Sequence, residues 1–281
     1  MERDIETRPR PSRLAVQDRA EFLKTLALVA GGAALWPLAG AGCAGTPDHE
    51  REAPVVHAET ITYPGHTGPV RGHLAAPAGR SRLGGVVVIH ENRGLNDHIR
   101  TVADRVAGEG FLAVAPDALS PVGGTPADAD QARTMIGQLN GDDTRQDFLA
   151  AVQYLKTHPR GNGKVGCVGF CWGGAMANQL AVHDPDLRCA VPYYGQPPAA
   201  GDVPRIRAAL LLHYAGLDER INAGIPGYEE ALKAAGVEYQ LYVYEGAQHA
   251  FNNDTSAERY HPEAAALAWQ RTIAFFREQL A

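Results

Sequence analysis

Short apolar segments alternate with amphipathic ones from about residue 53 to the end of the chain. The segment 86–90 (Val-Val-Val-Ile-His) is a nearly continuous β-branched run, as expected of a strand buried on both faces. Further strand-like runs lie at 110–115, 164–169, 188–194, 208–214 and 238–244. Helical patterns lie at about 96–108, 127–139, 143–158, from the turn after 169 to about 182, at 224–235 and at 259–279. This alternation predicts an α/β fold with a mostly parallel central sheet and helices on both faces.

The beginning of the chain has a different pattern. Residues 25–47 carry no charge and are rich in Ala, Gly and Leu, and they follow a polar segment with six basic and five acidic residues. The run is long enough to cross a bilayer, but its glycines and Pro37 make it a poor permanent anchor. Small residues then precede Cys43, as in an export signal with a cleavage region. We therefore interpret 1–52 as an export-signal-like segment and linker, 53–281 as the folded domain, and expect no membrane span in the mature protein.

Two local resemblances bear on the route of export. Residues 18–24 (Asp-Arg-Ala-Glu-Phe-Leu-Lys) resemble a twin-arginine signal in which Asp18 replaces the serine and Ala20 the second arginine. Cys43 resembles a lipoprotein attachment site, although Gly40 stands where leucine is usual. We expect an exported, periplasmic protein. A cytoplasmic protein with an uncleaved tail is the open alternative.

Composition narrows the classes of partner. The chain has 281 residues, 45% of them hydrophobic and 21% charged, which is ordinary for a globular protein. Its net charge is -6 and no basic patch stands out, so nucleic acid is not an expected partner. The oligomeric state is left open.

The four cysteines form neither a metal-ligand spacing nor a disulfide framework. Cys167 and Cys189 lie in strand-like runs that predict burial.

The segment 169–174 (Gly-Phe-Cys-Trp-Gly-Gly) has the form G-x-C-x-G between a predicted strand and a predicted helix. Glycines two positions before and after Cys171 allow a sharp turn that exposes the cysteine side chain. The helix N-terminus behind Cys171 favours a thiolate and can stabilise an oxyanion. Alone, this segment is also compatible with a tight turn that contains an incidental cysteine.

Two further residues follow predicted strands in the chain order nucleophile, acid, base. Asp218 comes after the run 208–214, and His249 comes after the run 238–244. In a parallel sheet both loops leave the carboxyl edge, where ligands bind. Asp218 can orient the imidazole, and His249 can take the thiol proton and later give it to the leaving group. The sequence therefore predicts a triad of Cys171, Asp218 and His249.

Together, four motifs resemble the dienelactone hydrolase family, also called carboxymethylenebutenolidase, of the α/β-hydrolase superfamily. They are the segment 90–96 (His-Glu-Asn-Arg-Gly-Leu-Asn), the cysteine turn, Asp218 and the segment 249–251 (His-Ala-Phe). The similarity runs from about residue 55 to the end of the chain. It implies an α/β-hydrolase fold and an enzyme that hydrolyses a small ester or lactone, without a cofactor, through a cysteine nucleophile.

The resemblance also assigns roles to three further residues. Glu91 would lie near the cysteine and help to generate the thiolate when substrate arrives. The backbone N–H groups of Asn92 and Trp172 would form the oxyanion hole. A carboxylate near Cys171 disfavours a resting thiolate by like-charge repulsion, which suits activation by substrate. The alternative for Glu91 is a structural salt bridge with Arg93 or another arginine.

The chain departs from the family pattern where arginines hold the substrate carboxylate. Residues 252–254 are Asn-Asn-Asp, and the lid-like stretch 119–126 has no arginine. Arg93 or Arg220 could substitute, so the substrate is left open as a neutral ester or a different lactone. His90, Glu91 and His98 lack the H-E-x-x-H spacing of a zinc helix, and we expect no metal.

Two other classes of function remain for comparison. One is a thioesterase or a small peptidase on the same fold. The other is a non-catalytic binding protein, which would have no need of Cys171, Asp218, His249 and Glu91 together.

Overall fold

The computed structural model describes residues 55–281. In this part of the chain, eight strands form one sheet in the order β1-β2-β4-β3-β5-β6-β7-β8. The strands are β1 (Val56–Pro64), β2 (Pro69–Pro77), β3 (Leu83–Ile89), β4 (Leu112–Pro116), β5 (Gly161–Phe170), β6 (Cys189–Tyr193), β7 (Ala209–Ala215) and β8 (Tyr239–Tyr244). β1 pairs antiparallel with β2, and β2 antiparallel with β4. All pairings from β4 to β8 are parallel, so the prediction of a mostly parallel sheet is confirmed.

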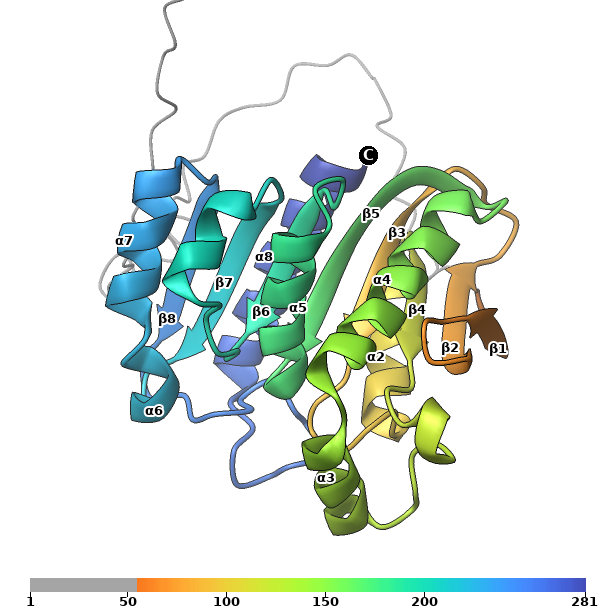
Figure 1. Ribbon diagram of the computed structural model, residues 1–281, viewed down its shortest axis with the longest axis horizontal. Coiled ribbons are helices and arrows are strands. Elements are labelled where there is room, and N and C mark those ends of the chain that lie inside the picture. Colours follow the sequence, from red (N-terminus) through yellow and green to blue (C-terminus); the bar gives the residue numbers. More distant parts are fainter. Residues whose placement is uncertain (1–54) are drawn as a thin grey trace, which may run out of the picture. The chain divides into compact units, whose positions relative to one another are not determined.

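Helices cover both faces of the sheet (Figure 1). They are α2 (Asp97–Gly108), α3 (Ala129–Gln138), α4 (Gly141–Thr157), α5 (Trp172–His183), α6 (Glu219–Asn222), α7 (Ile225–Ala235) and α8 (Pro262–Leu280), with short 3-10 helices at Ser120–Val122 and Ala200–Arg205. One core lies between the sheet and α4, α5 and α7, and the other between the sheet and α2 and α8. Successive side chains of β3 enter opposite cores, since Val87 and Ile89 belong to the first and Val86 and Val88 to the second. Burial on both faces explains the unbroken apolar run.

Side-chain caps set the beginnings of several helices. Asn96 caps α2 by accepting a hydrogen bond from the N–H of Ile99 at 3.1 Å. Asn140 caps α4 by accepting from the N–H groups of Asp142 and Asp143, whose carboxylates also suit the positive end of the helix.

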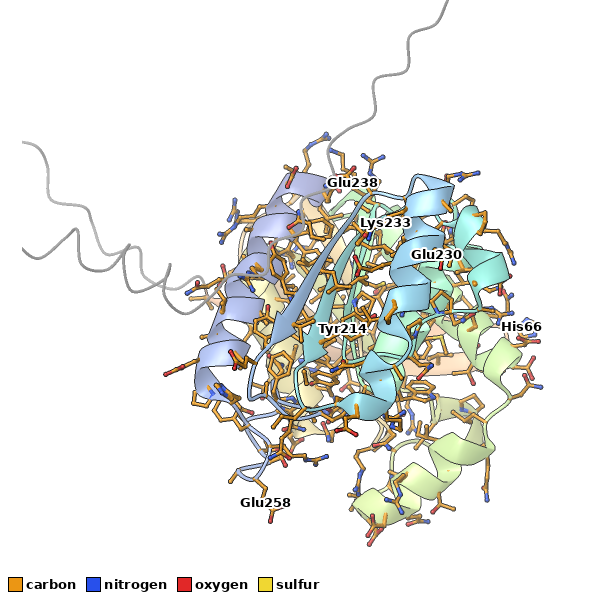
Figure 2. The ribbon with its side chains drawn as sticks, turned by 90° about the vertical axis from the view of Figure 1, so that its left-hand side faces the viewer. His66, Tyr214, Glu230, Lys233, Glu238 and Glu258 are labelled. Carbon is orange, nitrogen blue, oxygen red and sulfur yellow. The ribbon has the colours of Figure 1, made fainter. Side chains whose placement is uncertain are left out.

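The last six strands correspond to the six predicted runs, but β1 and β2 were not predicted. β1 is an edge strand with mostly exposed side chains, so it shows no apolar run. β2 begins with alternating exposed and buried residues and becomes apolar only near its end. The opposite edge of the sheet is β8, which lies between α7 and α8 in Figure 2. There Tyr214 of β7 lies beneath α7, while Glu230 and Lys233 of α7 are exposed.

The predicted export signal, its linker at 1–52 and Cys43 all fall outside residues 55–281, so they stay predictions. No helix within the described residues is long and apolar enough to span a membrane. Cys167 and Cys189 are fully buried, as predicted.

The turn between β5 and α5 brings backbone segments into unusually close contact. Cys171 occupies this turn with φ 56° and ψ -112°, a conformation that L-residues rarely adopt. Its N–H donates to the carbonyl of Tyr193 at 3.0 Å. A Cβ on Gly169 would lie 2.0 Å from the Gly173 carbonyl oxygen, and one on Gly173 would lie 2.4 Å from the His90 carbonyl oxygen. Both glycines are therefore needed because no side chain fits.

We predict that Gly173→Ala destabilises the protein by about 3 kcal/mol, since the new methyl group would overlap the backbone at the end of β3. The matched control is Gly137→Ala in α3, where a Cβ meets nothing within 4 Å and where alanine is the better helix former. Chemical denaturation measures both. An equal stability for the two variants would contradict the close packing of the turn.

Every strand that the structure describes and every candidate site residue lies after residue 55. We therefore predict that removal of the first 45 residues leaves the melting temperature and ester turnover nearly unchanged. Calorimetry and a turnover assay on the full and shortened chains test this. An insoluble or inactive shortened chain would mean that the missing segment belongs to the folded domain.

Candidate active site

Asp218 and His249 meet at the carboxyl edge of the sheet. In Figure 1 this is the lower edge, where α6 lies. His249 Nδ1 lies 2.5 Å from Asp218 Oδ2, and the other Asp218 oxygen accepts from the N–H of Ile221 at 3.3 Å. A carboxylate only accepts hydrogen bonds, so Nδ1 carries the proton and Nε2 is left as a proton acceptor. Asp218 is buried while His249 is part-exposed, which is the arrangement of an oriented general base.

Cys171 lies at the N-terminus of α5 and is half-buried. Burial, and next the charge of Glu91, raise the pKa of the Cys171 thiol to about 11. The Trp172 N–H and the charge of Arg220 favour the thiolate and oppose these effects, while Asp218 adds to them. The thiol is therefore protonated at neutral pH before substrate binds.

Glu91 follows β3 and is only 8% exposed. Its Oε2 accepts a hydrogen bond from Asn253 Nδ2 at 2.8 Å, and its Oε1 is buried without a partner among the described residues. Arg93 pairs instead with Asp130 at 3.0 Å. The alternative of a salt bridge between Glu91 and Arg93 is therefore wrong.

The loop after β3 is fixed by His90. Its ring stacks on Trp172, with 5.2 Å between ring centroids and 10° between planes. His90 Nε2 accepts from the N–H of Ala118 at 3.2 Å, so Nδ1 is the atom that donates to the Glu91 carbonyl at 2.6 Å. Among the hydrogen bonds within residues 55–281 that lie outside helices and strands, none uses the N–H of Asn92 or Trp172. The Asn92 N–H therefore has no protein acceptor among these bonds, whereas the Trp172 N–H interacts with the Cys171 sulfur.

The other residues of the metal alternative have protein partners. His98 Nδ1 lies 3.1 Å from Asp254 Oδ1. Both ring nitrogens of His90 are hydrogen-bonded, to Ala118 and to Glu91. His90 therefore joins the loop after β3 to Ala118, and His98 joins α2 to Asp254.

Tyr194 was not identified from the sequence. It follows β6 with φ 38°, and its ring lies 5.0 Å from that of His249 and 5.4 Å from that of Phe251. Its hydroxyl is buried without a partner among the described residues. Burial, then the charges of Glu91 and Cys171, raise the pKa of Tyr194. The sequence signal that could have identified Tyr194 as a site residue was its position just after a parallel strand, where ligands bind.

Two arginines were considered as substitutes for the missing arginines that hold a substrate carboxylate. They differ in whether another side chain already pairs with them. Arg93 is engaged by Asp130, whereas Arg220 is exposed in α6 and makes no ion pair within the described residues. Its charge acts on Cys171. Arg71 of β2 reaches the lid-like stretch 119–126 by donating to the Gly123 carbonyl at 2.6 Å, a contact that the sequence did not predict.

Comparison with known proteins identifies the family of this chain. The model of the dienelactone hydrolase family matches residues 70–280. Protein usf of Aquifex pyrophilus is 36% identical over 222 residues, which are 75% of this chain and 94% of that protein. An Escherichia coli (strain K12) protein, provisionally named carboxymethylenebutenolidase, is 32% identical over 208 residues, covering 69% and 76% of the two chains.

Solved structures give the same result. The dienelactone hydrolase-like promiscuous phosphotriesterase P91 from metagenomic libraries has a TM-score of 0.72 and 28% identity, covering 80% of this chain and 99% of its own. A Klebsiella pneumoniae protein provisionally described as a dienelactone hydrolase has a TM-score of 0.73 and 28% identity, covering 79% and 99%. The chain therefore belongs to the dienelactone hydrolase family and is a carboxylic ester hydrolase with the α/β-hydrolase fold.

Proposed function

We propose that the protein hydrolyses a small ester or lactone with Cys171 as the nucleophile, His249 as the general base and Asp218 as the residue that orients His249. The 2.5 Å contact between His249 and Asp218, beside the turn that presents Cys171, carries this proposal. It leaves His249 Nε2 free to accept a proton.

Glu91 is proposed to activate the thiol. The Cys171–Glu91 pair carries one negative charge in either of two states, carboxylate with thiol or carboxylic acid with thiolate. Transfer of the proton to Glu91 removes the repulsion that opposes the thiolate. The buried, unpartnered Oε1 is the atom available to receive it.

Formation and hydrolysis of a thioester on Cys171 complete the proposed reaction. The thiolate adds to the substrate carbonyl carbon, and the N–H groups of Asn92 and Trp172 stabilise the oxyanion. The C–O bond breaks, and the leaving oxygen takes the proton from Glu91. His249 then removes a proton from water as the water attacks the thioester, and returns that proton to the departing Cys171 thiolate.

A substrate panel tests the reaction class. It contains p-nitrophenyl esters, lactones, thioesters, peptides and, because of the P91 relative, a phosphotriester. Neutral esters are paired with carboxylate-bearing ones to test whether Arg220 contributes to substrate choice. Turnover confined to thioesters or peptides would replace the ester or lactone proposal, and no turnover at all would favour a binding protein.

We predict that Cys171→Ala lowers turnover by on the order of a thousandfold or more, because the bond-forming atom is lost. Cys171→Ser should also fold and be much slower, since an alcohol at neutral pH is a poorer nucleophile without a base tuned for it. Steady-state kinetics and melting temperatures measure both variants. Retained turnover in the alanine variant would remove Cys171 from the mechanism.

We predict that Glu91→Gln lowers turnover and also lowers the pH at which iodoacetamide alkylates Cys171, because the Glu91 charge is the largest cause after burial of the raised pKa of Cys171. The glutamine oxygen can still accept from Asn253, so the fold should persist. Mass spectrometry of the Cys171 peptide follows alkylation. Asp130→Asn, at an exposed carboxylate paired with Arg93, is the control and should change neither quantity.

A further inference from the structure

Asn253 has both ends of its side chain engaged at the site. It is 7% exposed, and its Oδ1 accepts from the N–H of Thr255 at 3.0 Å and from Thr255 Oγ1 at 2.6 Å. A backbone N–H can only donate, so Oδ1 must face Thr255 and Nδ2 must face Glu91. The amide is thus fixed as a donor to Glu91 Oε2 at 2.8 Å.

This donor is the one polar side chain bonded to the Glu91 carboxylate within residues 55–281. A buried carboxylate is costly without hydrogen bonds, and a donor favours its charged form. Because Asn253 is neutral, it does so without adding a cation that would also stabilise the Cys171 thiolate. It occupies one carboxylate oxygen and leaves the other available.

Other ionisable groups surround the pair. Tyr194 lies after β6, Asp218 and Arg220 lie in the loop and helix after β7, and His249 and Arg259 lie between β8 and α8. None of these side chains is hydrogen-bonded to Glu91. Their charges act on the site as a background that an Asn253 substitution leaves in place.

We propose that Asn253 is a positioning residue that holds Glu91 as a carboxylate with one oxygen free for the thiol proton, and that it thereby keeps Cys171 protonated until substrate binds. This inference rests on the proposed role of Glu91 in the hydrolysis. It assigns to Asn253 a function in the activation of the nucleophile rather than in the fold alone.

The test uses Asn253→Leu, which has a similar volume and no donor. With Oε2 no longer bonded, the Glu91 carboxylate loses the donor that fixes its orientation. Turnover should then fall about tenfold, because a hydrogen bond to a charged group is lost. Alkylation of Cys171 by iodoacetamide should move about one pH unit lower, because the repelling carboxylate is no longer held in place beside the thiol. Because local unfolding would also make the thiol more reactive, the melting temperature of each variant is measured beside its turnover and alkylation.

Two further variants keep the test decisive. Thr255→Val removes the hydroxyl contact that fixes the amide, and should shift both quantities in the same direction by less, even if Asn253→Leu fails to fold. In a Glu91→Gln background, Asn253→Leu should cause no additional shift in alkylation, because the charge through which it acts is gone. Asn252→Leu is the control, since Asn252 is a buried neighbour whose Nδ2 has no partner among the described residues.

The outcomes separate the two proposals. Folded Asn253→Leu and Thr255→Val proteins with unchanged turnover and alkylation would overturn the role of Asn253, while a slow Glu91→Gln enzyme would leave the mechanism standing. An additional alkylation shift in the double variant would also overturn it, because Asn253 would then act independently of Glu91. Unchanged turnover in Glu91→Gln or Cys171→Ala would instead overturn the proposed mechanism itself.

Discussion

The close approach of α5 to the end of β3 is the constraint on which the site depends. Gly173 has no room for a side chain because the His90 carbonyl occupies the place of its Cβ. This contact brings the cysteine turn beside the loop that carries Glu91 and Asn92. The stacking of His90 on Trp172 keeps the two segments in register. The electrostatic relation between thiol and carboxylate thus follows from a backbone contact.

Four side chains of the site form two hydrogen-bonded pairs. Asp218 and His249 form a bonded pair whose partners come from the loops after β7 and β8. Glu91 and Asn253 form a second pair, from the loops after β3 and β8. Residues 249–253 therefore supply one member of each pair. A shift of this short segment would alter the proposed base His249 and the proposed activating carboxylate Glu91 together.

The sequence predicted the parts of this structure that depend on local pattern. The runs that became β3 to β8 are buried on both faces or bounded by turns, and Asp218 and His249 were located because parallel strands end at one edge. β1 escaped prediction because its side chains are mostly exposed. Contacts between residues far apart in the sequence were not predicted either. No local pattern pairs Arg93 with Asp130, and Glu91 and Asn253 are separated by 162 positions in the sequence, so neither contact could be predicted.

The high pKa of Cys171 has a consequence for the lifetime of the enzyme. Peroxides and disulfides react with thiolates far faster than with thiols, so burial and the Glu91 charge, which raise the pKa of Cys171 to about 11, keep the sulfur in its slowly oxidised form at rest. Most cysteine nucleophiles gain reactivity at the cost of this vulnerability. In the proposed mechanism the sulfur becomes reactive only when Glu91 takes its proton. The exposure of the enzyme to sulfenic acid formation is therefore limited to the moments of turnover.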